Sequence, residues 1–594
     1  MSSSSSSVSL WINPEPFEFG IVPIPPPTKL VHHNLKKLFA YAKNKGKAGY
    51  PRISYAIWKH IACNKLQISE DVAWLYFQTC DTVTEHNCEF RLMVAEQYLT
   101  CKTDEEKAKW RERCSVDLLK FLIFLYMQHA HVISIKASLV VGEEWPSRSR
   151  SPELEGRAGV GAKTMNEHAQ LQFVQNNLME ILELLVEPDA YSMGANGDSS
   201  LTLDALKALG LLISGTSGRD VVPVDELASR QSQAQSSGYS KISRTFSTKK
   251  LYKWITLNLK SNPFGVSGTI SSGQRLRGRA YSVACEDSLS VSLSSSMGEE
   301  LIRNNRASID LRELQDSITN EIDLNTSIKL SQGPISNKII SNANFAPAGN
   351  HMMIFNQVCK RTVARAGDPL TKSRVKVHRC QYSHMYLLSP LRAISIEKCH
   401  GTKLFLGPVE TVVNIIACEN VEVCAVTRKI NINSCRNCVF HLFTETKPVL
   451  IGTNEDIFFA PYSTFYPALL QDMVTVGLTA SYNFWNEPLL PGSEASTASK
   501  VWDELDADNF FRLCTPFDME GDTKECPFRL PKKYEEALRK KEDQLDNWHK
   551  MVSEAKLTRD QKKQLQGMVQ SRFQEWLKET GNQQLLESLT LQHR

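Results

Sequence analysis

The chain has 594 residues, of which 42% are hydrophobic and 23% charged, and its formal net charge is +4. This length suits two or three domains with their own cores, and so small a net charge does not support a general nucleic-acid binder. The cysteine count is odd, at 15, and the opening MSSSSSSVSLW has neither the basic region nor the apolar run of a secretory signal. We therefore predict a cytoplasmic protein with reduced thiols and no disulfide framework.

The first part of the chain predicts an extended segment followed by a helical domain. Residues 1–31 contain PEPFEFGIVPIPPP, in which the prolines exclude a helix; a polyproline ligand is a weaker alternative. Residues 32–265 carry apolar residues at three- and four-residue spacing, and a helix is expected to end at Gly215. Their most apolar stretch, LLKFLIFLYM, is too short to span a membrane and predicts a buried helix.

Two polar runs interrupt this order. Residues 142–165 predict a flexible loop within the helical domain. Their GRAGVGAKT departs from a phosphate-binding loop, because an extra alanine precedes the lysine and no strand comes before it. Residues 266–348 are rich in serine and lack any long period, so we predict a disordered linker.

Residues 349–490 repeat a short pattern. Branched residues flank a single position in VKV, ISI, VNI and INI, and a cysteine follows each triplet, at 380, 399, 418 and 435. A period near 19 with several short strands predicts a parallel β-solenoid. Alternation along each strand places one set of residues inside the coils: Val377, Ile396, Ile415 and Ile432. It places a second set on the outside: Lys376, Ser395, Asn414 and Asn431.

The cysteines of this repeat favour a structural role. One cysteine per coil spreads the thiols along the solenoid axis, whereas zinc needs four ligands at one point. A small apolar thiol suits a tight interior corner, so we expect neither a metal nor a cofactor.

The histidines are scattered, and His32, His33 and His378 are interpreted as surface or hydrogen-bonded residues rather than ligands. A residue type common in turns stands two positions past most of the repeat cysteines, at Gly401, Asn420 and Asn437. Asp456 stands two positions past Asn454, which takes the place of the cysteine in the next repeat, and Tyr382 breaks the pattern.

The first coils are rich in basic residues. They are Lys360, Arg361, Arg365, Lys372, Arg374, Lys376 and Arg379. Two interpretations remain open: a basic surface for an acidic partner such as a tubulin tail, or an ordinary solvated face.

The end of the chain predicts a strand and loop at 491–530 and a helical hairpin at 531–594. Thr558 and Gln561 have capping-box spacing between two amphipathic helices. Lys541 interrupts the apolar stripe of the first helix, which favours packing on the protein itself over a partner-binding coiled-coil arm.

Several stretches resemble the tubulin-binding cofactor C (TBCC) domain-containing protein 1 family. They are YPRISYAIWKHIACNKLQISEDVAWLYF, VGEEWPS, SKISRTFS, HRCQYSHMYLLSPLRAISIEKC, PFDMEGDT and LTRDQKKQ, and the coils that end in IFFAPY look like the TBCC domain itself. The resemblance covers nearly all of the chain outside 266–348. It implies a right-handed β-helix of the C-CAP/cofactor C type at 349–490. It also implies association with the centrosome, spindle pole or basal body, and a role in organising the centrosome and Golgi.

The cofactor C relatives activate GTP hydrolysis through a Gln-x-Arg motif on one coil, whose arginine stabilises the transferring phosphoryl group. The resemblance puts Lys429 at the glutamine position and Asn431 at the arginine position. An asparagine supplies no cationic fork, which predicts that the catalytic arginine is lost. Arg428 lies three residues back, about 10 Å along a strand, and is the candidate for a displaced arginine.

These observations predict a non-enzymatic, cytoskeleton-associated organiser without cofactor or metal. Its partners are expected to be tubulin or a small GTPase and centrosomal proteins, without nucleic acid or a membrane span. A GTPase-activating protein that uses Arg428 is the alternative, and a scaffold without tubulin contact is a third interpretation. The expected partner-binding residues are Arg374, Lys376, Ser395, Asn414, Arg428, Lys429 and Asn431. The sequence leaves the direct partner and the oligomeric state open.

Overall fold

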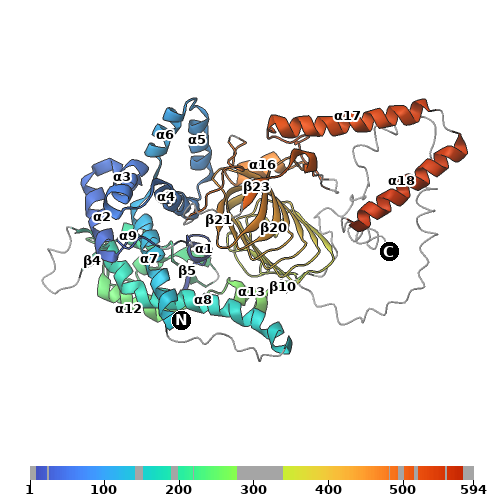
Figure 1. The fold of residues 1–594 in the computed structure, drawn as a ribbon. Helices are drawn as coiled ribbons and strands as arrows, with labels where there is room; N and C mark the ends of the chain where they lie inside the picture. Colours follow the sequence, from blue (N-terminus) through green and yellow to red (C-terminus); the bar gives the residue numbers. More distant parts are fainter. Residues whose placement is uncertain are drawn as a thin grey trace.

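The computed structural model describes residues 8–140, 152–188, 199–276, 339–480, 482–491, 501–513, 515, 519–555 and 558–579. Within these ranges, positions 23, 25 and 219 are not described. A mostly helical N-terminal domain packs against one side of a β-solenoid, and two helices extend from its other side (Figure 1). The expected fold class is confirmed. Within the described ranges, no helix has both the length and the apolar character that crossing a bilayer requires.

Two parallel sheets form the walls of the solenoid. The first contains β12 (Met352–Asn356), β14 (Arg374–His378), β16 (Ala393–Glu397), β18 (Val409–Ile416), the second half of β19 (Glu422–Asn433) and β21 (Val449–Ile451). The second contains β13 (Thr362–Arg365), β15 (His384–Leu387), β17 (Lys403–Leu406), the first half of β19, β20 (Arg436–Thr444), β22 (Glu455–Pro461) and β23 (Trp502–Glu504).

The interior of the solenoid is the predicted ladder. Val377 pairs with Ile396, Ile396 with Ile415, and Ile415 with Ile432. All four side chains are fully buried, so the predicted register is confirmed. The four coil cysteines are also buried beside them, and each thiol lies within hydrogen-bonding distance of backbone carbonyls, as Cys418 does with Ile396 and Ile416 at 3.5 Å. Asn454 takes the same place in the next coil, where its Oδ1 accepts from the Cys435 amide at 2.9 Å.

One corner of the solenoid is built from left-handed backbone, and we call it the turn edge. It comprises residues 357–360, 379–382, 398–401, 417–420, 434–437 and 452–456, and each of these segments contains positive-φ residues. Tyr382, expected to break the pattern, adopts the same conformation, with φ 49°. Gly401 is required beside it, because a Cβ there would lie 2.7 Å from the Tyr382 ring and φ is +56°.

The N-terminal domain has a large helical core. Its helices are α2 (His32–Asn44), α3 (Tyr55–Ile61), α4 (Glu70–Thr84), α5 (Cys88–Leu99), α6 (Asp104–Arg113), α7 (Leu118–Val140), α8 (Pro152–Leu185), α9 (Leu203–Leu209), α10 (Val224–Ser229), α11 (Ala234–Ser237) and α12 (Thr248–Asn258). The apolar stretch at 118–127 lies in α7 and is buried in the core as predicted. The same core includes Ala393, Val412 and Val449 of the solenoid, so apolar contacts join the two parts.

Three expectations for this domain are wrong. Residues 213–217 form β5 (Ile213–Ser217), so Gly215 lies within a strand rather than at a helix end. This strand joins β6 (Asp220–Pro223), β1 (Val8–Ile12) and β9 (Leu259–Lys260) in one sheet. The predicted loop at 142–165 is helical from Pro152 onward, and its residues 142–151 lie outside the described residues. The segment 1–31 contains a helical turn, α1 (Glu15–Glu18), with proline in its first turn, a position that proline tolerates.

The ends of the predicted linker are ordered elements, which corrects its boundaries. Residues 266–272 form α13 (Val266–Ser272), and β10 (Gln274–Arg275) pairs with β11 (Ile339–Ser341), which continues antiparallel onto β12. Residues 277–338 lie outside the described residues, so the prediction of disorder there stays a prediction.

The C-terminal helices are α17 (Lys532–Glu554) and α18 (Arg559–Glu579). Gln561 accepts from the Thr558 amide at 3.0 Å and its own amide donates to Thr558 Oγ1 at 3.4 Å, so the predicted capping box is confirmed. The first turns of α17 pack on the solenoid through Tyr534 and Leu538, and Lys541 donates to two backbone carbonyls there.

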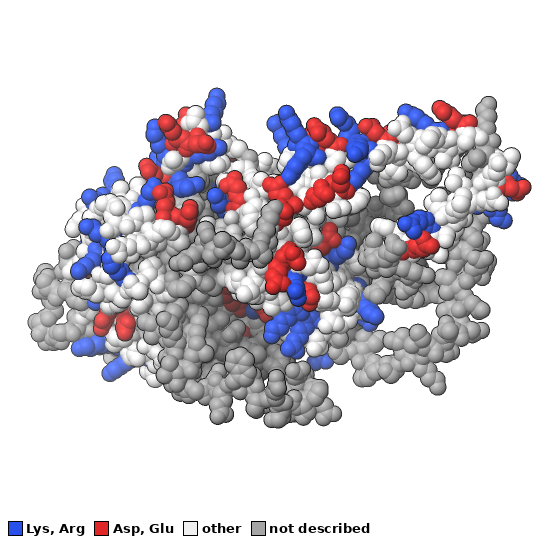
Figure 2. Space-filling view, viewed as in Figure 1, with Lys and Arg blue, Asp and Glu red and all other residues white. Residues whose placement is uncertain are grey.

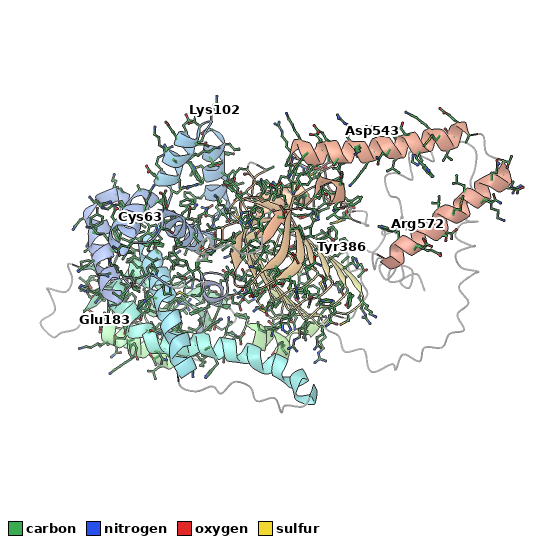
Figure 3. All side chains as sticks on the ribbon, in the orientation of Figure 1. Cys63, Lys102, Glu183, Tyr386, Asp543 and Arg572 are labelled. Carbon is green, nitrogen blue, oxygen red and sulfur yellow. The ribbon has the colours of Figure 1, made fainter. Side chains whose placement is uncertain are left out.

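Beyond Lys541, the expectation that the apolar faces of both C-terminal helices pack on the protein itself is wrong. The helices diverge from their junction (Figure 1), and their side chains project away from the other described elements around Asp543 and Arg572 (Figure 3). Trp548 is 41% exposed and Phe573 is 49% exposed. The described part of 531–594 is therefore an open pair of helices rather than a closely packed hairpin.

The interior ladder can be tested with Ile415→Asp. A buried carboxylate without a partner should lower the free energy of unfolding by about 3–5 kcal/mol, which urea denaturation measures. The control is Asn420→Asp, which adds the same charge at an exposed turn and keeps the oxygen that accepts from Asn437 at 2.6 Å. Equal stability of the two variants would contradict the ladder.

Candidate functional site

The predicted outer row lies on the first sheet of the solenoid. Lys376, Ser395, Asn414 and Asn431 are paired in register along β14, β16, β18 and β19. They alternate with the buried ladder and point away from the solenoid interior, as expected. However, Ser395 is only 5% exposed and Asn414 only 7% exposed, so this face is not open to solvent.

Helix α1 of the same chain covers this row (Figure 1). Lys376 Nζ lies 2.9 Å from Glu18 Oε1, and the Asn414 side chain donates to the Glu18 carbonyl at 2.9 Å. Asn431 Nδ2 in turn donates to Asn414 Oδ1 at 2.8 Å. The chain therefore binds its own N-terminal segment at the position where the sequence predicts a partner.

A second contact fixes α1 through Arg392, which directly precedes β16. Its guanidinium binds the Glu15 carboxylate with two contacts of 3.1 Å and Glu410 with one of 2.6 Å. Burial alone would raise the pKa of Glu15, but the attraction and hydrogen bonds of Arg392 outweigh burial and hold that pKa at about 2. Such fork-shaped pairing is strong and directional, so Arg392 locks α1 onto the solenoid.

Lys429 lies beneath helix α4. It is 3% exposed, and its ammonium group contacts the Thr79 hydroxyl of that helix. Burial lowers its pKa from 10.5 to about 7. A lysine in this position contributes to the domain joint and is not accessible to a partner.

Arg428 is enclosed in the same region. Its guanidinium donates to the Glu410 and Gly477 carbonyls and to Glu445 Oε2, each at 3.0 Å, and it is 6% exposed. Burial lowers the pKa of Arg428 and raises that of Glu445. All of this hydrogen bonding is internal, so Arg428 braces β19 against the segment after α16 (Leu469–Thr475).

The predicted basic surface is divided rather than continuous. Arg365 and Arg374 are buried, and Lys376 is paired with Glu18. Lys360, Arg361 and Lys372 are exposed, and Arg379 is half-buried. Lys360 and Arg379 belong to the turn edge, where Lys398 is also exposed.

The amino-acid sequence matches the model of the family Tubulin binding cofactor C over residues 372–489. It is 38% identical to TBCC domain-containing protein 1 of Rattus norvegicus, covering 98% of this chain and 95% of the relative. The same protein of Homo sapiens is 38% identical, and that of Gallus gallus 39%, with 97% and 98% of their lengths covered.

The chain belongs to the TBCC domain-containing protein 1 family. The family match begins at Lys372 and ends at Leu489, beyond α16, so it includes the outer row, Arg428 and Lys429. Within this TBCC domain, the positions that the resemblance assigns to the glutamine and arginine are Lys429 and Asn431. The first is buried under α4, and the second is hydrogen-bonded within the row.

Sequence reasoning missed the residues that cover the TBCC domain. Glu15, Glu18 and Thr79 belong to elements far away in the chain, with Glu18 separated from Lys376 by 358 positions. The nearest sequence signal was the acidic PEPFE segment, whose prolines suit the first turn of a helix.

The burial of Lys429 in this TBCC domain family member predicts a pH-dependent stability difference. Between pH 7 and 10.5 the unfolded chain binds more protons than the folded chain at this site, so the site destabilises the fold least at high pH. Lys429→Met should therefore be more stable than wild type at pH 7. This advantage should shrink as pH rises, by up to roughly 5 kcal/mol over the range.

Urea denaturation of both proteins across this pH range measures the effect. Lys398→Met is the control, because Lys398 is exposed at the turn edge and its replacement should leave the pH profile of stability unchanged. A difference between Lys429→Met and wild type that does not vary with pH would contradict the burial of a charged lysine.

Proposed function

We propose that this chain is a non-enzymatic, cytoskeleton-associated protein that helps to organise and position the centrosome and Golgi. Membership of the TBCC domain-containing protein 1 family supports a tubulin-cofactor-like protein. The centrosome, spindle pole or basal body is the proposed place of action. In this proposal the solenoid recognises tubulin or a GTPase-type partner, together with centrosomal proteins.

The observation that carries the non-enzymatic part is the state of the outer row. Asn431 has no positive charge, and its amide group is committed to Asn414 at 2.8 Å. Neutralising a phosphoryl transition state needs a cation that reaches the substrate. The row's own cation, Lys376, is paired with Glu18, and the neighbouring Lys429 on β19 is buried under α4.

The second candidate function is GTPase activation by Arg428. The geometry counts against it, because the guanidinium would have to leave Glu445 and two backbone carbonyls to reach a nucleotide. Removing an arginine from a buried pair of this kind leaves the carboxylate uncompensated, at a cost of about 3–5 kcal/mol.

The turn edge is the proposed recognition surface. Its first coils expose Lys360 and Lys398, whereas later coils expose Glu419 and an ion pair between Arg436 and Glu455 at 3.0 Å. Figure 2 shows Lys and Arg gathered at the lower end of the solenoid, beneath a cluster of Asp and Glu. An acidic segment such as a tubulin tail would be attracted to the basic first coils, which carry Lys360 and Lys398.

The double change Lys360→Glu with Lys398→Glu should weaken binding to microtubules in cosedimentation, with the largest effect at low salt because surface attraction is screened by ions. Lys47→Glu is the control, since Lys47 is exposed on the N-terminal domain. The tagged double variant should also be reduced at the centrosome in cells. Unchanged pelleting at low salt would remove the turn edge from the proposal, and absence of the wild-type protein from the centrosome would overturn the proposed location.

Wild-type protein should leave GTP hydrolysis by tubulin and by small GTPases at its intrinsic rate, measured as phosphate release. The double change Lys429→Gln with Asn431→Arg should also be silent, because α4 covers Lys429 and α1 contacts Asn414 directly beside Asn431. The control is Arg428→Lys, which keeps a positive charge next to Glu445 but loses the fork geometry. Stimulation by wild type that disappears in Arg428→Lys would establish the enzyme instead.

A further inference from the structure

A cavity of about 520 Å³ lies at the joint between the N-terminal domain and the solenoid. Its walls come from β1, α4, α7, α9 and β5 on one side and from the connections before β14 and β16 on the other. This volume is within the range of small-molecule sites, roughly 300–1,000 Å³. The cavity is separate from the turn edge and from the outer row.

Basic side chains outnumber acidic ones in the lining. Five are cationic, namely Lys120, Lys207, Lys372, Arg374 and Arg392, against the two carboxylates Glu15 and Glu410. Arg392 already binds both carboxylates, and Lys207 pairs with Asp204 on its own helix at 3.2 Å. His86 adds no positive charge at neutral pH, because burial and the neighbouring Arg392 lower its pKa to about 3.

Three cations are left over at the cavity wall. Among the residues that the structure describes, the side chains of Lys120, Lys372 and Arg374 have no hydrogen-bond or ion-pair partner. Arg374 is the informative one, because it is only 5% exposed. Glu15 is attracted to Arg374 but is hydrogen-bonded to Arg392.

The side chain of Trp11 borders the same cavity. Trp11 Nε1 is buried and has no partner within the described structure, and the Trp11 side chain is part of the lining. Leaving a buried donor or a buried charge unsatisfied is costly. The Arg374 charge, unpaired beside the likewise unpaired Lys120 and Lys372, therefore favours an anion in this cavity.

We propose that this cavity binds a small organic phosphate with two or more negative charges. Lysine and arginine are the side chains that recognise phosphate oxygens, and Arg374 with Lys372 would receive them at the solenoid corner. Apolar side chains of Val83, Leu211 and Val221 form another part of the wall and would contact the organic part of the ligand. The ligand would touch both domains, so its binding stabilises the joint that Arg392 and α1 form.

The test uses the full chain with ADP and inorganic pyrophosphate as probes and adenosine as the uncharged control. Isothermal titration calorimetry should show binding of ADP and weaker binding of pyrophosphate. Adenosine should not bind. ADP should also raise the midpoint of thermal unfolding, because a ligand that binds the folded state stabilises it.

Lys372→Glu should weaken ADP binding about tenfold or more, as expected for losing a charge-assisted contact and adding a repulsive one. The matched control is Lys360→Glu, since both lysines are exposed solenoid residues with φ 51°. Arg374→Gln should weaken ADP binding further. If replacing the buried Arg374 prevents folding, Lys120→Gln gives an independent measurement of the loss of ADP binding. No binding of any phosphate, or equal weakening by Lys372→Glu and Lys360→Glu, would overturn the site.

A final arm distinguishes free phosphates from lipid headgroups. Vesicles of phosphatidylcholine with and without a bisphosphorylated inositol lipid are pelleted with wild type and Lys372→Glu. Binding of ADP without vesicle binding supports a free organic phosphate. Vesicle binding that needs the phosphorylated lipid and Lys372 supports a headgroup as the source, and vesicle binding that Lys372→Glu leaves unchanged counts against the cavity.

Discussion

Stacking of coils in strict register is the constraint on which the rest of this molecule depends. Each strand of the first sheet pairs with the next at the same residue positions, from Val377 through Ile415. Since side chains alternate along a strand, fixing the branched residues inside also fixes which residues point outward. The outer row, the turn edge and the cysteine column are consequences of this one register.

The N-terminal domain uses the surface that the register creates. Ala393, Val412 and Val449 enter its apolar core, while Glu15 and Glu18 pair with Arg392 and Lys376 around that contact. Buried ion pairs add little net stability compared with apolar packing, but they impose geometry. The combination joins a helical domain and a solenoid in one orientation, and it covers much of the outer row.

Much of the solenoid was predictable because its signal repeats. A V-x-V triplet followed by a cysteine specifies strand, interior face and coil length together, and the ladder was confirmed residue by residue. Tyr382 was judged an exception because its residue type is unusual for left-handed backbone, yet the turns on either side of it impose φ 49°. The covering of the row could not be predicted, because Lys429 meets Thr79 across 350 positions of chain and a single sequence holds no record of such pairing. The helical turn of α1 was missed because proline was taken as a breaker at a position where it is tolerated.

The connections between the two sheets on the side of the domain joint differ in length. They comprise residues 366–373 after β13, 388–392 after β15 and 407–408 after β17, and in the next coil β19 runs through without interruption. The length of these connections, as much as side-chain chemistry, therefore determines how the N-terminal domain sits against the solenoid. An insertion of one residue in 388–392 would move the chain by about 3.5 Å, more than the 3.1 Å that separates Arg392 from Glu15. Insertions and deletions are thus constrained here more strongly than substitutions, and evolution of this joint would proceed by changing whole connections or whole coils.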